Sequence, residues 1–167
     1  MKRIARFEKV SRSRFEEDWL DTFGERAPEG LYDRLMLPVR ATGGSAGYDF
    51  KCTRDVCLEP GETVSIPTGI RVWIEEGWVL QLFPRSGLGV RYRMQLNNSV
   101  GIIDSDYYGS RNEGHIFIKI TNDSKEGKAL ALREGDGFVQ GVFVEYGITL
   151  DDEASARRDG GFGSTSK

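Results

Sequence analysis

The chain has 167 residues, of which 38% are hydrophobic and 29% are charged, and its formal net charge is −3. This length suits one globular domain, and a slightly acidic chain has no overall positive field to draw it to DNA or to a membrane surface. No apolar run approaches the roughly 18 residues that a membrane helix needs, and no stretch resembles a signal peptide. We therefore expect a cytoplasmic protein that binds neither membranes nor nucleic acid directly.

Residues 1–36 differ in pattern from the rest of the chain. Ser13 and Glu16 have the S-x-x-E spacing of a capping box. Apolar side chains then recur on one helical stripe, at Phe15, Trp19, Leu20 and Phe23. Gly24 and Pro28 are suitable stop signals. The pattern predicts a short amphipathic helix, which either covers part of the core or binds a partner.

Residues 37–150 consist of short apolar runs separated by Gly, Pro, Asn and Asp. The 21 glycines exceed the usual share of about 7% and predict many turns. Short strands at this spacing favour an all-β sandwich or barrel over an α/β fold. The expected strands are 48–52, 62–66, 69–74, 78–83, 116–120 and 138–146. Residues 151–167 are charged and then rich in Gly and Ser, so we expect a mobile arm.

Cys52 and Cys57 are the only cysteines, and His115 is the only histidine. A structural zinc site normally needs four Cys or His ligands, so no such site is expected here. We expect two reduced, structural thiols. A catalytic triad is also disfavoured, because no Ser or Cys near His115 lies in a recognisable nucleophile motif.

The segment 84–89 contains residue types that bind anions. Arg85 offers planar charged donors, Ser86 offers a hydroxyl, and Gly87 would let backbone N–H groups approach an anion closely. By itself the segment could equally be a plain turn with a surface arginine.

In the segment 101–109, an apolar run leads to Asp104, Asp106 and Tyr107. If the backbone is extended here, both carboxylates share one face and need a nearby cation or metal, for which Arg85 is a candidate. The alternative is a solvated turn.

In the tail, glycines and hydroxyls surround the lone Phe162, which suits a lid over an aromatic base and its phosphates. A disordered terminus is the alternative. The spacing of a P-loop is absent.

Five segments, in chain order, resemble the five motifs of the homotrimeric dUTPases. They are 46–49, 84–89, 101–109, 135–140 and 160–165, the last together with Arg157. The resemblance runs from about residue 37 to the C-terminus. It implies a distorted β jelly roll, of barrel or sandwich form, with a short N-terminal helical extension. It also implies a homotrimer in which all three subunits build each active site and the arm at 151–167 closes a neighbouring one.

The resemblance implies hydrolysis of dUTP to dUMP and pyrophosphate, which limits uracil in DNA and supplies dUMP for dTMP synthesis. Asp104 would be the general base that activates water, with Gln140 and Arg157 completing the catalytic set at the phosphates. Tyr107 would lie under the deoxyribose and exclude a 2′-hydroxyl. Mg²⁺ would be held mainly by the substrate phosphates, with Asp49 supporting its water shell.

The remaining substrate-binding residues follow from the same matching of motifs. The phosphates would be bound by Arg85, Ser86 and Gly87. Asn98 and the backbone of the hairpin that contains Gly101 and Ile103 would read the uracil edge. The arm would contribute Phe162, Gly163, Ser164 and Thr165.

The chain departs from the family pattern at several places. Gly137 and Phe138 stand where a basic residue and an apolar one are common, and Arg158 replaces a usual glycine. The turn at 110–114 is longer than usual, and the N-terminal helix is extra. These differences bear on loop geometry and regulation more than on the reaction.

Two other functions compete with dUTP hydrolysis. A dCTP deaminase shares the fold, but it uses a glutamate on the strand after the third motif, where this chain has Lys119. A phage-type dUTPase with an added regulatory role remains open, since the N-terminal helix and the turn at 110–114 could bind a protein partner.

Overall fold

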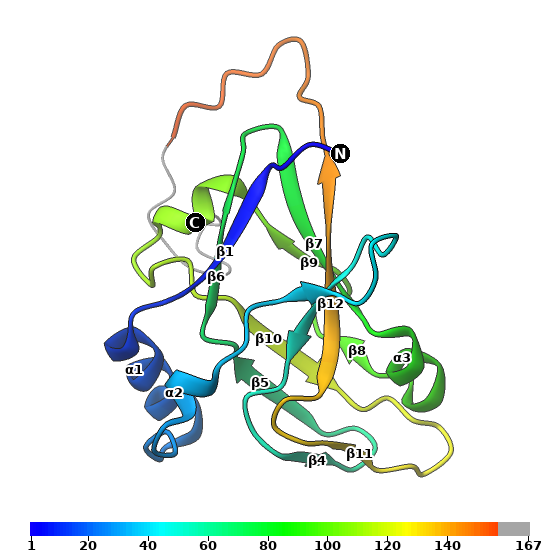
Figure 1. Ribbon diagram of the computed structural model, residues 1–167. Coiled ribbons are helices and arrows are strands. Elements are labelled where there is room, and N and C mark those ends of the chain that lie inside the picture. The colour runs from blue at the N-terminus through cyan, green and yellow to red at the C-terminus, as the bar shows by residue number, and fades with distance from the viewer. Residues whose placement is uncertain (157–167) are drawn as a thin grey trace.

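Antiparallel strand pairing organises the protein (Figure 1), whose computed structural model describes residues 1–156. The strands form a five-stranded sheet in the order β2-β3-β12-β7-β9, a three-stranded sheet in the order β5-β10-β8, and two ribbons, β1-β6 and β11-β4. Their bounds are β1 Ala5–Lys9, β2 Val39–Arg40, β3 Tyr48–Lys51, β4 Val56–Leu58, β5 Thr63–Pro67, β6 Ile70–Ile74, β7 Trp78–Pro84, β8 Gln95–Leu96, β9 Gly101–Ile103, β10 Phe117–Thr121, β11 Leu130–Leu132 and β12 Gly137–Glu145. Across the described residues these sheets do not join into one closed barrel.

The six strands expected from the sequence are confirmed, each end lying within one residue of its predicted position. In β6 and β10 buried side chains alternate with less buried ones, whereas every side chain of β7 is buried or half-buried. Their inward side chains form one large apolar core, with Phe50, Leu80 and Phe138 among the most buried. The shorter strands and β1 were not predicted, because two- or three-residue strands carry almost no periodic signal.

Three short helices and one 3₁₀ turn complete the described structure: α1 Arg12–Phe23, α2 Leu31–Arg34, α3 Ser86–Tyr92 and η1 Ser105–Gly109. In Figure 1, α1 and α2 lie together on the side of the molecule opposite α3. None of these helices has the length and apolar character needed to cross a membrane.

The predicted amphipathic helix is confirmed as α1, but the residue expected to cap it was wrong. Ser11, not Ser13, is the N-cap: its backbone is extended, and its hydroxyl accepts a hydrogen bond from the Arg14 N–H. Gly24 ends the helix in the left-handed conformation, as predicted. Phe15 and Trp19 are buried in a second apolar cluster, whereas Leu20 is 46% exposed.

Candidate active site

Asp49, Arg85 and Gln140 lie together where β3, β12 and the end of β7 meet. Strand register places Gln140 directly opposite both Asp49 and Phe83, one residue before the end of β7. Arg85 Nε is 3.5 Å from the Asp49 carboxylate, and Gln140 Nε2 donates to the Pro84 carbonyl at 3.4 Å. We call these three residues the Arg85 cluster. It combines a guanidinium, a carboxylate and a carboxamide at a solvent-facing edge.

Two glycines make room for the side chains of this cluster. A Cβ at Gly47 would lie 2.6 Å from Gln140 Oε1, and a Cβ at Gly137 would lie 2.7 Å from Arg85 Nη1. Arg85 thus extends across the backbone of β12 at the position where a basic residue is common in the resembling proteins. Sequence reasoning did not predict that either glycine makes this room, because the contacts join segments far apart in the chain.

Ser86 and Gly87 open α3 directly after Arg85, and both are exposed. The first turn of a helix leaves backbone N–H groups without partners inside the helix, and such groups bind anions well. The predicted anion-binding segment therefore stands beside the Arg85 cluster with its donors open to solvent.

The segment predicted to be a base-reading hairpin is not a hairpin: the turn at 97–100 joins β8, which pairs with β10, to β9, which pairs with β7. Asn98 is exposed in the turn, and the following Ser99 has a positive φ of 63°. Gly101 and Ile103 are buried, and Gly101 packs against the Leu82 side chain of β7. The turn is thus exposed, whereas β9, which follows it, is anchored in the sheet through Gly101 and Ile103.

Asp104 follows β9 directly and is the N-cap of η1, with an extended backbone. Of the two alternatives that the sequence left open here, an extended segment and a turn, the structure has the turn, because η1 begins at Ser105. Asp104 is half-buried and Asp106 is exposed. Tyr107 is buried, and its hydroxyl donates to the His115 carbonyl at 2.7 Å.

Strand register separates Asp104 from Arg85 within one chain. In the antiparallel pair of β7 and β9, Gly101 lies opposite Leu82 and Ile103 lies opposite Leu80. Asp104, which follows Ile103, therefore lies near the start of β7, whereas Arg85 lies just after the end of β7. At ~3.3 Å per residue this places them roughly 20 Å apart along the strand. Arg85 is thus not the neighbouring cation of Asp104 in the same chain, contrary to the expectation.

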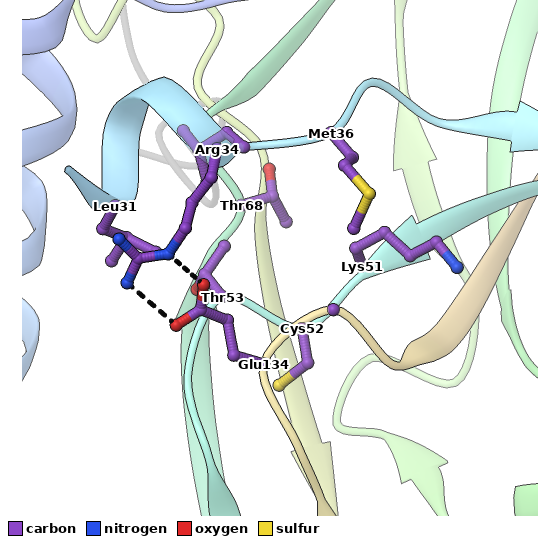
Figure 2. Close-up of a pocket in the computed structure, with 10 residues that line it drawn as sticks. Leu31, Arg34, Met36, Lys51, Cys52, Thr53, Thr68 and Glu134 are labelled. Atoms are coloured by element: carbon purple, nitrogen blue, oxygen red, sulfur yellow. Dashed lines mark hydrogen bonds and ion pairs between the residues drawn. The ribbon is translucent and has the colours of Figure 1, made fainter.

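A separate small cleft lies between α2 and the end of β3 (Figure 2). Arg34 and Glu134 form an ion pair beside it, with Nε and Oε1 2.5 Å apart. Cys52 lines the cleft, and burial raises the pKa of its thiol to about 11, so the thiol is a poor nucleophile at neutral pH. Both Cys52 and Cys57 are free thiols, as predicted. Among residues 1–156, none of the predicted site residues lines this cleft.

Five of the predicted site residues, Arg157, Phe162, Gly163, Ser164 and Thr165, lie outside the described residues, as does Arg158. Lys119, which argued against a deaminase, is exposed on β10, the strand that follows the third motif.

An antiparallel β fold that brings a guanidinium and exposed backbone donors together at strand ends is suited to a phosphate-bearing ligand. Comparison with known proteins narrows this class. The dUTPase family model matches residues 33–166. The "Deoxyuridine 5'-triphosphate nucleotidohydrolase" of Lactococcus lactis is 40% identical over 134 residues, which cover 78% of this chain and 88% of the relative. The chain belongs to the dUTPase family.

Solved structures agree with this assignment. The chain resembles the crystal structure of dUTPase from Streptococcus mutans, with a TM-score of 0.64, 33% identity, and coverage of 87% of this chain and 98% of that one. It also has the fold of a dUTPase from phage phi11 of S. aureus that coordinates a structural Mg(II) ion, with a TM-score of 0.64 and 21% identity over 92% of this chain and 98% of that one. The predicted jelly-roll-like fold is thereby confirmed, without a closed barrel.

Proposed function

We propose that this protein hydrolyses dUTP to dUMP and pyrophosphate. The observation that carries the proposal is the Arg85 cluster, which lies at solvent-facing strand ends, matches dUTPase motifs and belongs to a chain of that family. Removal of dUTP would limit uracil in DNA, and the dUMP formed would supply dTMP synthesis. We also assign the protein to the cytoplasm.

The separation of Asp104 from Arg85 supports a site shared between subunits. A general base roughly 20 Å from the phosphate-binding arginine cannot act on the same α-phosphate within one chain. A closed ring of three copies would bring the Arg85 cluster of one subunit to the 101–109 segment of another. We therefore propose a homotrimer, in which the arm containing Arg157 and Phe162 completes the site of a neighbour.

In the proposed reaction, Asp104 orients a water molecule and accepts one of its protons as the water oxygen attacks the α-phosphorus. The bond from the α-phosphorus to the bridging oxygen breaks, and pyrophosphate leaves. The phosphates are bound by Arg85, Ser86, Gly87 and Gln140. These contacts hold the triphosphate so that the leaving pyrophosphate lies opposite the attacking water. Tyr107 packs against the deoxyribose, and Asn98 with the backbone at Gly101 and Ile103 reads the uracil.

The donors present fit Mg²⁺ held mainly by substrate phosphates. Asp49 offers carboxylate oxygens beside Arg85, and the described residues contain no cluster of three or more Asp, Glu, His or Cys that would form a protein cage. A site with only one nearby carboxylate suits Mg²⁺, because this ion usually keeps several of its water ligands. Bound Mg²⁺ would neutralise phosphate charge, and Asp49 would orient its water shell.

The first test measures pyrophosphate release from dUTP, dCTP, dTTP and UTP by the purified protein with Mg²⁺. We expect rapid release from dUTP and almost none from the other three. Ammonia release from dCTP would support the deaminase instead and would overturn the proposal.

A mixing experiment tests the shared site. Arg85→Ala and Asp104→Asn should each be inactive alone. When the two are unfolded together and refolded as a mixture, about one site in four should receive both native residues from different chains, and activity should return to that extent. Sites built within one chain would stay inactive, and absence of recovery from a refolded mixture would refute the shared site.

A further inference from the structure

Two features that depart from the family pattern, the N-terminal helix and the long turn at 110–114, contact each other. Glu113, from the turn, accepts hydrogen bonds from the Ser11 N–H at 2.7 Å and from the Ser11 hydroxyl at 2.6 Å. Ser11 is the N-cap of α1, so a carboxylate sits at the positive end of that helix. Burial alone would raise the pKa of Glu113, but the hydrogen bonds from Ser11 and the charges of Arg71 and Arg14 outweigh it and lower that pKa.

A second contact lies about two helical turns farther along α1. Asp18 on α1 and His115, directly after the turn, are both buried, and Asp18 Oδ2 is 2.5 Å from His115 Nδ1. The other ring nitrogen, Nε2, accepts the Gly69 N–H at 2.8 Å. Nδ1 must therefore carry the proton that bonds to Asp18. Both ring nitrogens of His115 therefore have a hydrogen-bond partner. Asp18 also accepts a hydrogen bond from Arg14 at 2.7 Å.

The backbone of His115 holds Tyr107. The Tyr107 hydroxyl donates to the His115 carbonyl, and Asn112 Nδ2 donates to the Tyr107 hydroxyl at 2.9 Å. Gly114 lies so close to Tyr107 and Tyr108 that a Cβ there would be 2.9 Å from their backbone atoms. The turn is thus packed directly against the third motif, and its far side is fastened to α1.

We propose that Asp18 and Glu113 form a clamp through which the N-terminal helix positions Tyr107 and so sets the discrimination between deoxyribose and ribose. This inference rests on the proposed function, in which Tyr107 packs against the sugar. Asp18 is a positioning residue that acts through His115 and never contacts the nucleotide. The Tyr107 ring can exclude a 2′-hydroxyl only if it stays in position. Loss of the clamp should therefore increase hydrolysis of UTP more than it decreases hydrolysis of dUTP.

The test compares Asp18→Ala with Asp21→Ala. Both remove a carboxylate from α1, but Asp21 is exposed. Two readouts are needed: amide hydrogen exchange of residues 104–115, and the ratio of kcat/KM for dUTP to that for UTP. For Asp18→Ala we expect exchange to rise and the ratio to fall, each by about fivefold to tenfold, as for loss of a buried hydrogen bond. Asp21→Ala should match the wild type.

The outcomes separate the two proposals. Wild-type protein that does not release pyrophosphate from dUTP would defeat the proposed function, while the exchange data would still decide whether the clamp holds residues 104–115. Unchanged exchange in folded Asp18→Ala would overturn the clamp, and raised exchange with an unchanged dUTP to UTP ratio would overturn its role in selectivity. If Asp18→Ala does not fold, Glu113→Gln replaces it in the test. We then expect smaller changes in hydrogen exchange and in the dUTP to UTP ratio, and an unchanged exchange rate or an unchanged ratio would have the same meaning as above.

Discussion

The Arg85 cluster and the 104–115 segment hold their side chains in opposite ways. In the cluster, Arg85 and Gln140 make contacts of 3.4 to 3.5 Å, and the Arg85 side chain is 44% exposed. In the 104–115 segment, the Tyr107 hydroxyl and the His115 ring are buried and bonded at 2.5 to 2.9 Å.

This difference matches what each part is proposed to recognise, the phosphates by the Arg85 cluster and the deoxyribose by the 104–115 segment. Phosphates are charged and reachable from several directions, so flexible cationic side chains in water can reorient onto them when they arrive. Sugar selection depends on excluding one hydroxyl, and exclusion requires a surface that is already fixed. Under this proposal the side chains of the Arg85 cluster take their final positions when phosphates bind, whereas those of the 104–115 segment are already fixed in the folded protein.

The largest effect should come from Asp104, the first residue of the 104–115 segment and the proposed general base. Asp104→Asn keeps the size of the side chain but removes its basicity, so turnover should fall by about 10²- to 10⁴-fold. Binding of a non-hydrolysable dUTP analogue, measured by calorimetry, should change little. Turnover near the wild-type value would remove Asp104 from the mechanism, and a parallel loss of binding would assign it to recognition instead.

A smaller loss of activity is expected from a substitution at Gly47, where the absence of a Cβ makes room for Gln140 of the Arg85 cluster. Gly47→Ala would place its methyl group 2.6 Å from Gln140 Oε1 and displace that carboxamide. We expect kcat/KM for dUTP to fall about tenfold, as for loss of one or two hydrogen bonds to a charged group. The folding of the protein should be little affected.

Gly44→Ala is the matched control, because a Cβ at Gly44 has no atom within 4 Å and the residue lies in the same loop. It should leave kcat/KM unchanged. Equal losses in the two variants would mean that activity depends on the loop conformation and not on the space for Gln140. No loss in Gly47→Ala would show that the Gln140 side chain can move without loss of activity.

Sequence patterns predicted the parts of the two regions but not their placement. Alternation and turn residues are local signals, so the strands that carry Asp49 and Gln140 were predicted to within one residue. The separation of Asp104 from Arg85 depends on strand register, which no local pattern contains. The contact of Asp18 with His115 joins residues 97 positions apart, and neither lies in a motif.

The smallest effect concerns Glu8 of β1, which ties the 104–115 segment to the rest of the fold. Its carboxylate accepts hydrogen bonds from the Tyr108 hydroxyl at 2.7 Å and from Arg71 at 2.9 Å. The Tyr108 hydrogen bond, followed by those of Arg6 and Arg71, lowers the pKa of Glu8 below its ordinary value of 4.5, against the effect of burial. A lowered folded-state pKa means that Glu8 stabilises the protein while it is ionised.

That stabilisation should be fully present above pH 4.5 and should be lost as the pH falls through the lower pKa of the folded state. Glu8→Gln should therefore lower the Tm by about 1 to 3 °C at pH 7, as for a largely solvent-screened contact, and the difference from the wild type should shrink toward zero in acid. Glu76→Gln, in the exposed turn before β7, controls for loss of a surface charge. A difference that persists unchanged to pH 3 would mean that Glu8 acts through packing, and the 104–115 segment would then be held by α1 more than by β1.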